Sequence, residues 1–209
     1  MRLAKDIITA IACSSVMLVT TTAAAADAYP SRPVRVIVPQ SPSGSTDIAT
    51  RIVTDRLGEA LKQNFIVDNR PGAGSLTGTD LVAKSAPDGY TLLGVAASFT
   101  ITPAMHRNMP FNPVRDFIPI TQLADLPHIL VVHPSVAAKS VQELVALLKS
   151  KPGQITCAFS GVGTSTHLAT ELFQHLSGTK MLLVPYKGGS PAMAALLGGE
   201  VQVNFSASS

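Results

Sequence analysis

Short apolar runs alternate along the chain with stretches in which apolar residues recur at helical spacing. Between residues 46 and 61, Ile48, Ile52, Val53 and Leu57 follow this spacing, which predicts an amphipathic helix. The other predicted elements are strands at 34–38, 65–67, 90–95, 129–132, 156–159, 181–184 and 201–205, and helices at 79–84, at 165–176, and from Ser140 and Ser190 onward. Repeated strand–helix units with mostly apolar strands predict an α/β fold with a parallel or mixed sheet.

Capping signals mark the starts of two later helices. Ser140 and Glu143 form a capping box, in which the serine accepts a backbone hydrogen bond and the glutamate returns one. Ser190 and Pro191 are predicted as the N-cap and the first residue of the last helix. The proline-rich residues 102–120 are predicted to form an irregular surface segment.

The N-terminal segment 1–28 has the pattern of a secretory signal peptide. Arg2 and Lys5 give it a basic start, the apolar run 7–19 is too short to span a bilayer, and small residues allow cleavage after Ala28 or two residues earlier. The pattern predicts export of a chain with no later membrane-spanning segment. The net charge of +3 includes no polybasic run, so the sequence gives no case for binding nucleic acid.

Two loops of small polar residues, 43–47 and 160–165, each follow an apolar run and lead into a predicted helix. The first N–H groups of a helix have no partner within it, so such a turn is a ready site for an anion. Neither loop carries the lysine of a phosphate-binding P-loop. The pair therefore favours a small anion such as a carboxylate, although either loop alone is explained as simply by helix capping.

Catalytic and metal-binding chemistry find little support in the sequence. Ser165 and His167 are two positions apart, and residues at that spacing on a helix do not face each other. A helix N-cap at Ser165 followed by a polar helix residue is the simpler interpretation, and no Gly-x-Ser-x-Gly elbow is present. The histidines form no His-x-x-x-His pair, and Cys157 has no close partner. We therefore expect the protein to bind no metal ion and no cofactor, and not to be an enzyme.

Longer strings of residues point to one family. In this order along the chain, they closely resemble the Bug-type extracytoplasmic receptors of tripartite tricarboxylate transporters, and the resemblance extends from Tyr29 to Phe205. The strings are residues 38–47, 67–74, 86–93, 116–120, 160–167, 184–188 and 196–199.

The resemblance implies a periplasmic receptor that binds a small carboxylate and delivers it to the membrane subunits of the transporter. It implies an α/β, periplasmic-binding-protein-like (type II) two-lobe fold, with lobe 1 at 29–127 and a partial lobe 2 at 128–209. The sequence stops after the strand 201–205, where such a lobe would continue. We therefore expect a fold incomplete at the C-terminus, without the return segment of lobe 1, in a monomeric protein.

The resemblance also assigns the ligand-binding residues. Those of the first lobe are Ser43, Gly44, Ser45, Thr46 and Asp47, and those of the second are Gly163, Thr164 and Ser165, with the loop Tyr186, Lys187 and Gly188 nearby.

Three of these residues need separate interpretation. The carboxylate of Asp47 would repel an anion, so we expect it to accept hydrogen bonds from backbone donors. Lys187 either attracts the ligand or is an exposed loop lysine. Ser43 stands where the family usually has glycine, which matters if that position needs a positive φ.

Two alternatives stay open. The chain could be a partly folded or non-functional fragment of such a receptor, because strands of a sheet without their neighbours are poorly protected. More distantly, it could be a secreted hydrolase that uses Ser165 and a histidine.

Overall fold

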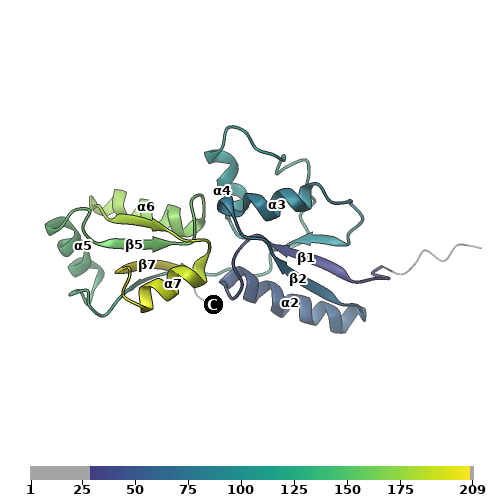
Figure 1. Ribbon diagram of the computed structural model, residues 1–209, viewed down its shortest axis with the longest axis horizontal. Coiled ribbons are helices and arrows are strands. Elements are labelled where there is room, and N and C mark those ends of the chain that lie inside the picture. Colours follow the sequence, from purple (N-terminus) through teal and green to yellow (C-terminus); the bar gives the residue numbers. More distant parts are fainter. Residues whose placement is uncertain (1–28, 208–209) are drawn as a thin grey trace, which may run out of the picture. The chain divides into compact units, whose positions relative to one another are not determined.

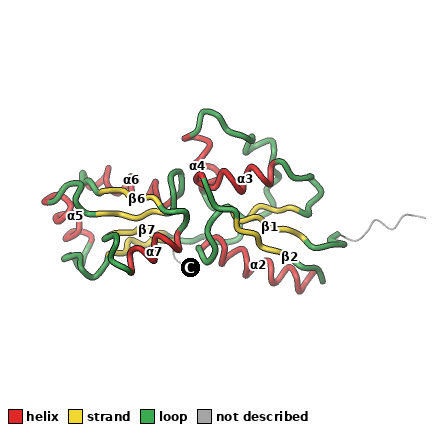
Figure 2. The backbone as a smooth tube through the Cα atoms, in the orientation of Figure 1, coloured by secondary structure: helices red, strands yellow, loops and turns green. Residues whose placement is uncertain are grey.

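Two β-sheets organise the part of the chain that the structure describes, residues 29–207. The computed structural model is shown in Figures 1 and 2; the predicted signal peptide 1–28 lies outside the described residues. The first sheet has the order β2–β1–β3, with all strands parallel. Its strands are β1 (Val34–Val38), β2 (Phe65–Asn69) and β3 (Thr91–Leu93).

The second sheet has four strands in the order β4–β7–β5–β6. β4 (His128–Val132) is antiparallel to β7 (Val203–Ala207), whereas β5 (Thr156–Phe159) is parallel to both β7 and β6 (Leu182–Pro185). One parallel and one mixed sheet confirm the predicted α/β class.

Helices cover the sheets. They are α2 (Ser45–Leu61), α3 (Leu76–Ala83) after a short 3-10 turn η1 (Ala73–Ser75), α4 (Ser98–Met105), α5 (Val141–Ser150), α6 (Ser165–Ser177) and α7 (Gly189–Leu197). Figure 1 shows α2 and α3 on either side of β1, and α6 and α7 on either side of β5. All these elements lie in one compact unit, Arg32–Ser209. None of the described helices is long and apolar enough to cross a membrane.

One predicted irregular segment begins with a helix instead. The last residues of α4, Thr102–Met105, fall inside the segment 102–120, and Pro103 lies within the helix. Proline removes one backbone hydrogen bond, but tertiary contacts hold the helix in place: the Thr102 hydroxyl donates to Gly74 O at 3.1 Å, and Phe99 packs edge-on against Phe117. The prediction was therefore wrong for 102–105. From residue 106 to 127 the chain has neither helix nor strand (Figure 2).

Two helix starts differ from the predicted caps. α7 begins at Gly189, one residue before the predicted N-cap, so Ser190 lies inside the first turn, where its hydroxyl donates to Pro42 O at 3.0 Å. At α6 the N-cap is Thr164, whose hydroxyl accepts the His167 N–H at 3.4 Å, and Ser165 is the first helical residue.

The capping box of α5 is confirmed in one half. The Ser140 hydroxyl accepts the Glu143 N–H at 3.2 Å, as the sequence predicts. The Glu143 carboxylate accepts from the Lys139 N–H at 2.7 Å, one residue before the expected donor. Two backbone donors at the helix start are still satisfied.

The second sheet has a hydrophobic core on each face. On one face, Leu144 and Leu148 of α5 pack with Cys157 of β5 and Val203 of β7. On the other face, apolar residues of α7 pack against Ala158. The strand β5 is thus covered on both sides, which is typical of parallel sheets in α/β proteins.

The loop between β1 and α2 is held by the carboxylate of Asp47, whose side chain is only 3% exposed. This carboxylate accepts hydrogen bonds from the Ser43 N–H at 2.8 Å, from Arg51 Nε at 3.0 Å and from Asn69 Nδ2 at 2.9 Å. Because Asn69 ends β2, the network ties the loop to the sheet. The expectation that Asp47 serves a backbone donor is confirmed.

Ser43 adopts a left-handed backbone conformation, with φ 60°. A non-glycine residue there costs about 1–2 kcal/mol, and the Asp47 carboxylate offsets part of this cost by accepting the Ser43 N–H. Burial raises the pKa of Asp47, but the hydrogen bonds from Arg51, Asn69 and Ser43 and the charge of Arg51 outweigh it. The net result is a pKa below the ordinary value.

We predict that Leu148→Ala lowers the free energy of unfolding by about 2–5 kcal/mol, because the side chain is fully buried between α5 and the sheet. Urea unfolding followed by circular dichroism measures this. Leu176→Ala is the matched control, because Leu176 is a helical leucine that is 76% exposed; its effect should stay within about 0.5 kcal/mol. Equal losses in both variants would contradict the assignment of the core.

We predict that Asp47→Asn lowers stability at pH 7 by about 1–3 kcal/mol, because Ser43, Arg51 and Asn69 lose a charged acceptor. A carboxylate with a lowered folded-state pKa stabilises the fold above its unfolded-state pKa, and this contribution disappears as the pH falls through the folded-state value. The gap between wild type and variant should therefore narrow below about pH 4. Asp55→Asn, at an exposed position on the same helix, is the control. Unfolding curves that stay parallel from pH 7 to pH 2 would argue against the network.

Candidate functional site

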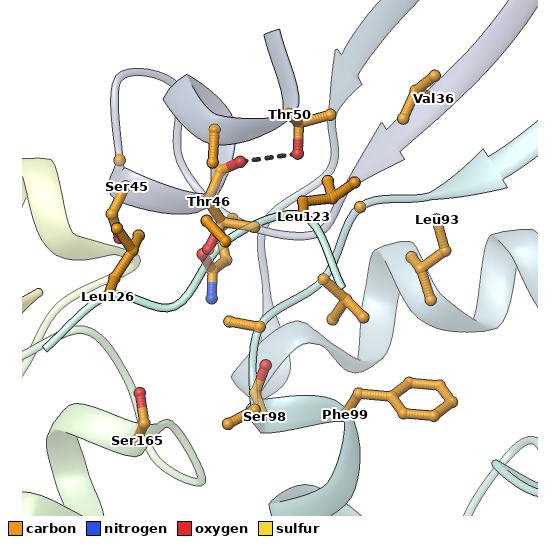
Figure 3. A pocket seen from close by; sticks show the side chains of 18 of the residues that line it. Val36, Ser45, Thr46, Thr50, Leu93, Ser98, Phe99, Leu123, Leu126 and Ser165 are labelled. Carbon is orange, nitrogen blue, oxygen red and sulfur yellow. Dashed lines mark hydrogen bonds between the residues drawn. The ribbon is translucent and has the colours of Figure 1, made fainter. Parts of the chain in front are cut away.

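A cavity of about 1970 Å³ is lined by the starts of α2, α6 and α7 and by the irregular segment 113–126. Figure 3 shows Ser45 and Thr46 from α2, Ser165 from α6, and Leu123 and Leu126 from the irregular segment among the lining side chains. This volume is about twice the upper range for small-molecule pockets. A small ligand at the polar loops would therefore fill only part of it.

The first predicted loop contributes a helix start without a side-chain cap. Ser43, Gly44, Ser45 and Thr46 all line the cavity. The N-cap of α2 is Gly44, and no side chain hydrogen-bonds the first turn from that position. The first-turn N–H groups are therefore available to an acceptor in the cavity, together with the partial positive charge of the helix dipole.

Asp47 has a different place from the rest of its loop. It is buried and does not line the cavity, and its two carboxylate oxygens accept from Ser43, Arg51 and Asn69. The negative charge is thus balanced locally by Arg51 and does not face the cavity. In this arrangement Asp47 positions the loop.

The second predicted loop divides its hydroxyl groups between the loop itself and the cavity. The Ser160 Oγ lies 3.2 Å from Thr164 Oγ1 and 2.7 Å from Thr166 Oγ1, and the Ser160 N–H donates to Thr166 Oγ1 at 3.0 Å. This cluster fixes the turn. Thr164 and Ser165 both line the cavity, whereas Gly163, at φ 81°, lies outside the lining and close to Thr102 of α4.

The third predicted loop lies outside the cavity wall. Neither Tyr186, Lys187 nor Gly188 lines the cavity, and Lys187 is exposed. Gly188 has φ 152°, and a Cβ atom at this position would collide with the side chain of Ser41. The first residues of α7, Gly189 and Ser190, line the cavity in place of this loop.

His128 is a site residue that the sequence reasoning missed. It begins β4, lines the cavity, and its Nε2 lies 3.0 Å from the Ser165 Oγ. The two residues are 37 positions apart, so no local spacing could reveal the pair. His128 is still exposed to solvent, and its partial desolvation lowers its pKa from the ordinary value.

The histidine that the sequence placed nearest to Ser165 is engaged elsewhere. The ring of His167 stacks on Phe159 at a centroid distance of 4.7 Å, and its Nδ1 accepts from the Gly163 N–H at 3.5 Å. Within residues 29–207, the ring of His128 has no hydrogen bond besides that to Ser165. The Ser165–His128 pair therefore lacks the orienting carboxylate of a hydrolytic triad.

The charged groups at the cavity are few. Besides His128, the titratable lining residues are Arg115, Asp116 and Asp125. Arg115 pairs with Asp116 at 2.9 Å, so its charge is already partly balanced. In the described part of the chain, no group of three or more His, Cys, Asp or Glu side chains could hold a metal ion.

Comparison with known proteins identifies the family. The family model described as "Tripartite tricarboxylate transporter family receptor", TctC, matches residues 49–208. Protein BugT of Bordetella pertussis is 40% identical over 182 residues, which are 86% of this chain and 56% of BugT. The chain thus spans about half the length of this curated relative.

Solved structures of similar proteins share the fold. The periplasmic binding protein BugD matches with a TM-score of 0.82 and 32% identity, over 86% of this chain and 60% of BugD. The R. palustris protein Rpa4515, solved with adipate, matches with a TM-score of 0.83 and 33% identity over the same shares. The likeness confirms the predicted periplasmic-binding-protein type of α/β fold. The chain therefore belongs to the TctC family of tripartite tricarboxylate transporter receptors, whose Bug members are periplasmic solute-binding proteins.

Proposed function

We propose that this chain is an extracytoplasmic receptor that binds a small carboxylate and delivers it to the membrane subunits of a tripartite tricarboxylate transporter. The observation that carries the proposal is that the starts of α2 and α6 line one cavity. The structure of the relative Rpa4515 with adipate supports a carboxylate as the ligand. Such a receptor binds and releases its ligand without changing it chemically.

The physical basis of binding is a set of neutral donors. At the start of α2, uncapped N–H groups and the Ser45 and Thr46 side chains face the cavity; at the start of α6, the Ser165 hydroxyl does. A carboxylate near a helix start gains about 0.3–1 kcal/mol from the dipole, and up to about 2 kcal/mol when partly buried. Each hydrogen bond to a charged acceptor adds about 1.5–3 kcal/mol. Two such starts suffice for a dicarboxylate without an arginine clamp.

The predicted site residues take different roles in this proposal. Ser43, Gly44, Ser45, Thr46, Thr164 and Ser165 line the cavity and are the ligand-contact candidates. Asp47 positions the first loop, and Gly163 permits the left-handed turn of the second. Lys187, outside the lining, contributes at most long-range attraction.

The proposal includes two lobes, 29–127 and 128–209, that close on the ligand. The stretch 106–127, which has neither helix nor strand, precedes β4. It connects the part of the chain that forms the first sheet to the part that forms the second. A ligand that contacts both lobes favours the closed state, because only that state gains both sets of contacts. We further propose a monomeric receptor exported by the segment 1–28.

We predict that Thr46→Ala and Ser165→Ala each weaken binding of adipate about two- to tenfold, because each removes one hydroxyl donor from the cavity. Isothermal titration calorimetry of the purified protein measures the dissociation constants. Thr100→Ala and Ser150→Ala are matched controls, because both residues are exposed helical positions outside the cavity lining. Thermal melts of all four variants show that the fold is kept.

Unchanged affinity in both cavity variants would refute the site. If adipate does not bind the wild-type protein, a panel of mono-, di- and tricarboxylates takes its place. The absence of binding across that panel would refute the proposed function.

A further inference from the structure

His128 places an ionisable ring at the start of the second helix of the site. Its Nε2 lies 3.0 Å from the hydroxyl of Ser165, the first residue of α6, and both residues line the cavity. A neutral imidazole has one donor and one acceptor nitrogen, whereas the protonated ring has two donors. The bond to Ser165 engages one nitrogen, and protonation makes both nitrogens donors and adds a positive charge beside the anion site.

Few unbalanced charges lie around His128, so the charge of its ring matters to an anion in the cavity. β7, which pairs with β4, and α7 carry no charged side chain. The irregular segment brings Arg115, Asp116 and Asp125 to the same cavity, with Arg115 paired to Asp116. At the start of α6 stands His167, stacked on Phe159 and 3.8 Å from Glu171. On the first loop, the charge of Asp47 is balanced by Arg51.

We propose that His128 is a proton-linked selectivity residue, which takes up a proton when a carboxylate binds at the start of α6 and so makes the site prefer anionic over neutral solutes. This inference rests on the proposed function and adds proton uptake at the same site to it. The geometry supports it: among the described residues, His128 is the one titratable side chain hydrogen-bonded to a hydroxyl of the two loops that faces the cavity.

The direction of the effect follows from linkage. Partial desolvation keeps the pKa of free His128 below its ordinary value, so the neutral ring predominates at pH 7. An adjacent carboxylate raises the pKa in the complex, because an opposite charge favours the protonated ring. The added affinity is complete below the pKa of the free protein and is lost as the pH rises through the pKa of the complex. A shift of one unit corresponds to a tenfold change in affinity.

The test is calorimetry with adipate at pH 6.5 in two buffers of different ionisation enthalpy, which gives the number of protons taken up per ligand. We expect proton uptake by the wild-type protein and binding about two- to fivefold tighter at pH 6 than at pH 8, because a shift of one unit gives its full tenfold effect only well below the pKa of the free protein. We expect His128→Gln to abolish the uptake, because glutamine keeps a hydrogen-bonding group but does not titrate. Protonation of adipate itself occurs equally with both proteins and cancels in the comparison.

Two controls make the result specific. His175→Gln changes an exposed histidine at the other end of α6 and should leave proton uptake at the wild-type value. Adipamide, the neutral analogue of adipate, should bind more weakly and without proton uptake. Adipate binding with the same proton uptake in wild type and His128→Gln would overturn the role of His128 while leaving the proposed function intact. The absence of carboxylate binding in the wild-type protein would overturn both.

Discussion

The burial of two central strands, β1 and β5, is the constraint on which the site depends. Val34, Ile37 and Val38 of β1 and Cys157 and Ala158 of β5 have no exposed surface. Each strand has a strand on both sides and helices on both faces, so its position cannot shift without opening a core. The chain leaves the carboxyl end of each strand and turns into a helix. The two polar loops are therefore placed by the cores beneath them, and ligand sites commonly occupy this edge of α/β sheets.

Within the loops, polar groups divide between holding the turn and facing the cavity. Asp47 is fully engaged by Ser43, Arg51 and Asn69, and Ser160 forms a closed cluster with Thr164 and Thr166. These bonds fix the loops within the chain itself; in the proposed receptor, such preorganisation would reduce the entropy lost on binding. What is left for the cavity is a small set of neutral donors at two helix starts, with His128 as the titratable partner of Ser165. A site of this kind recognises charge without supplying a fixed counter-charge.

Sequence patterns predicted helices and strands well where interactions between residues close in the chain determine the local structure. The strand 34–38 and the end of its helix at Leu61 agree with the structure, because helical spacing of apolar residues indicates a helix. The spacing did not identify the buried face of α2, where Thr50 and Thr54 are buried while Ile52 is exposed. The predictions failed where a side chain contacts a residue that is distant in the sequence. Ser190 lies inside the first turn of α7, where its hydroxyl donates to Pro42 O. The helix α4 forms despite Pro103, and its residues Thr102 and Phe99 contact residues outside the helix. In each case the competing contact is long-range and invisible to a local pattern.

The sequence by itself determined the class of fold, the two polar loops and the family resemblance, because these depend on periodicity and on residues that are close in the chain. Only the tertiary structure decided which polar groups remain for the cavity. It assigned Asp47 to the interior, left the loop at 186–188 outside the cavity wall, and paired Ser165 with His128 from another strand instead of with His167. The physical reason is that hydrogen-bond partners are chosen by proximity in space, and that proximity arises only when β4 and β5 join the same sheet.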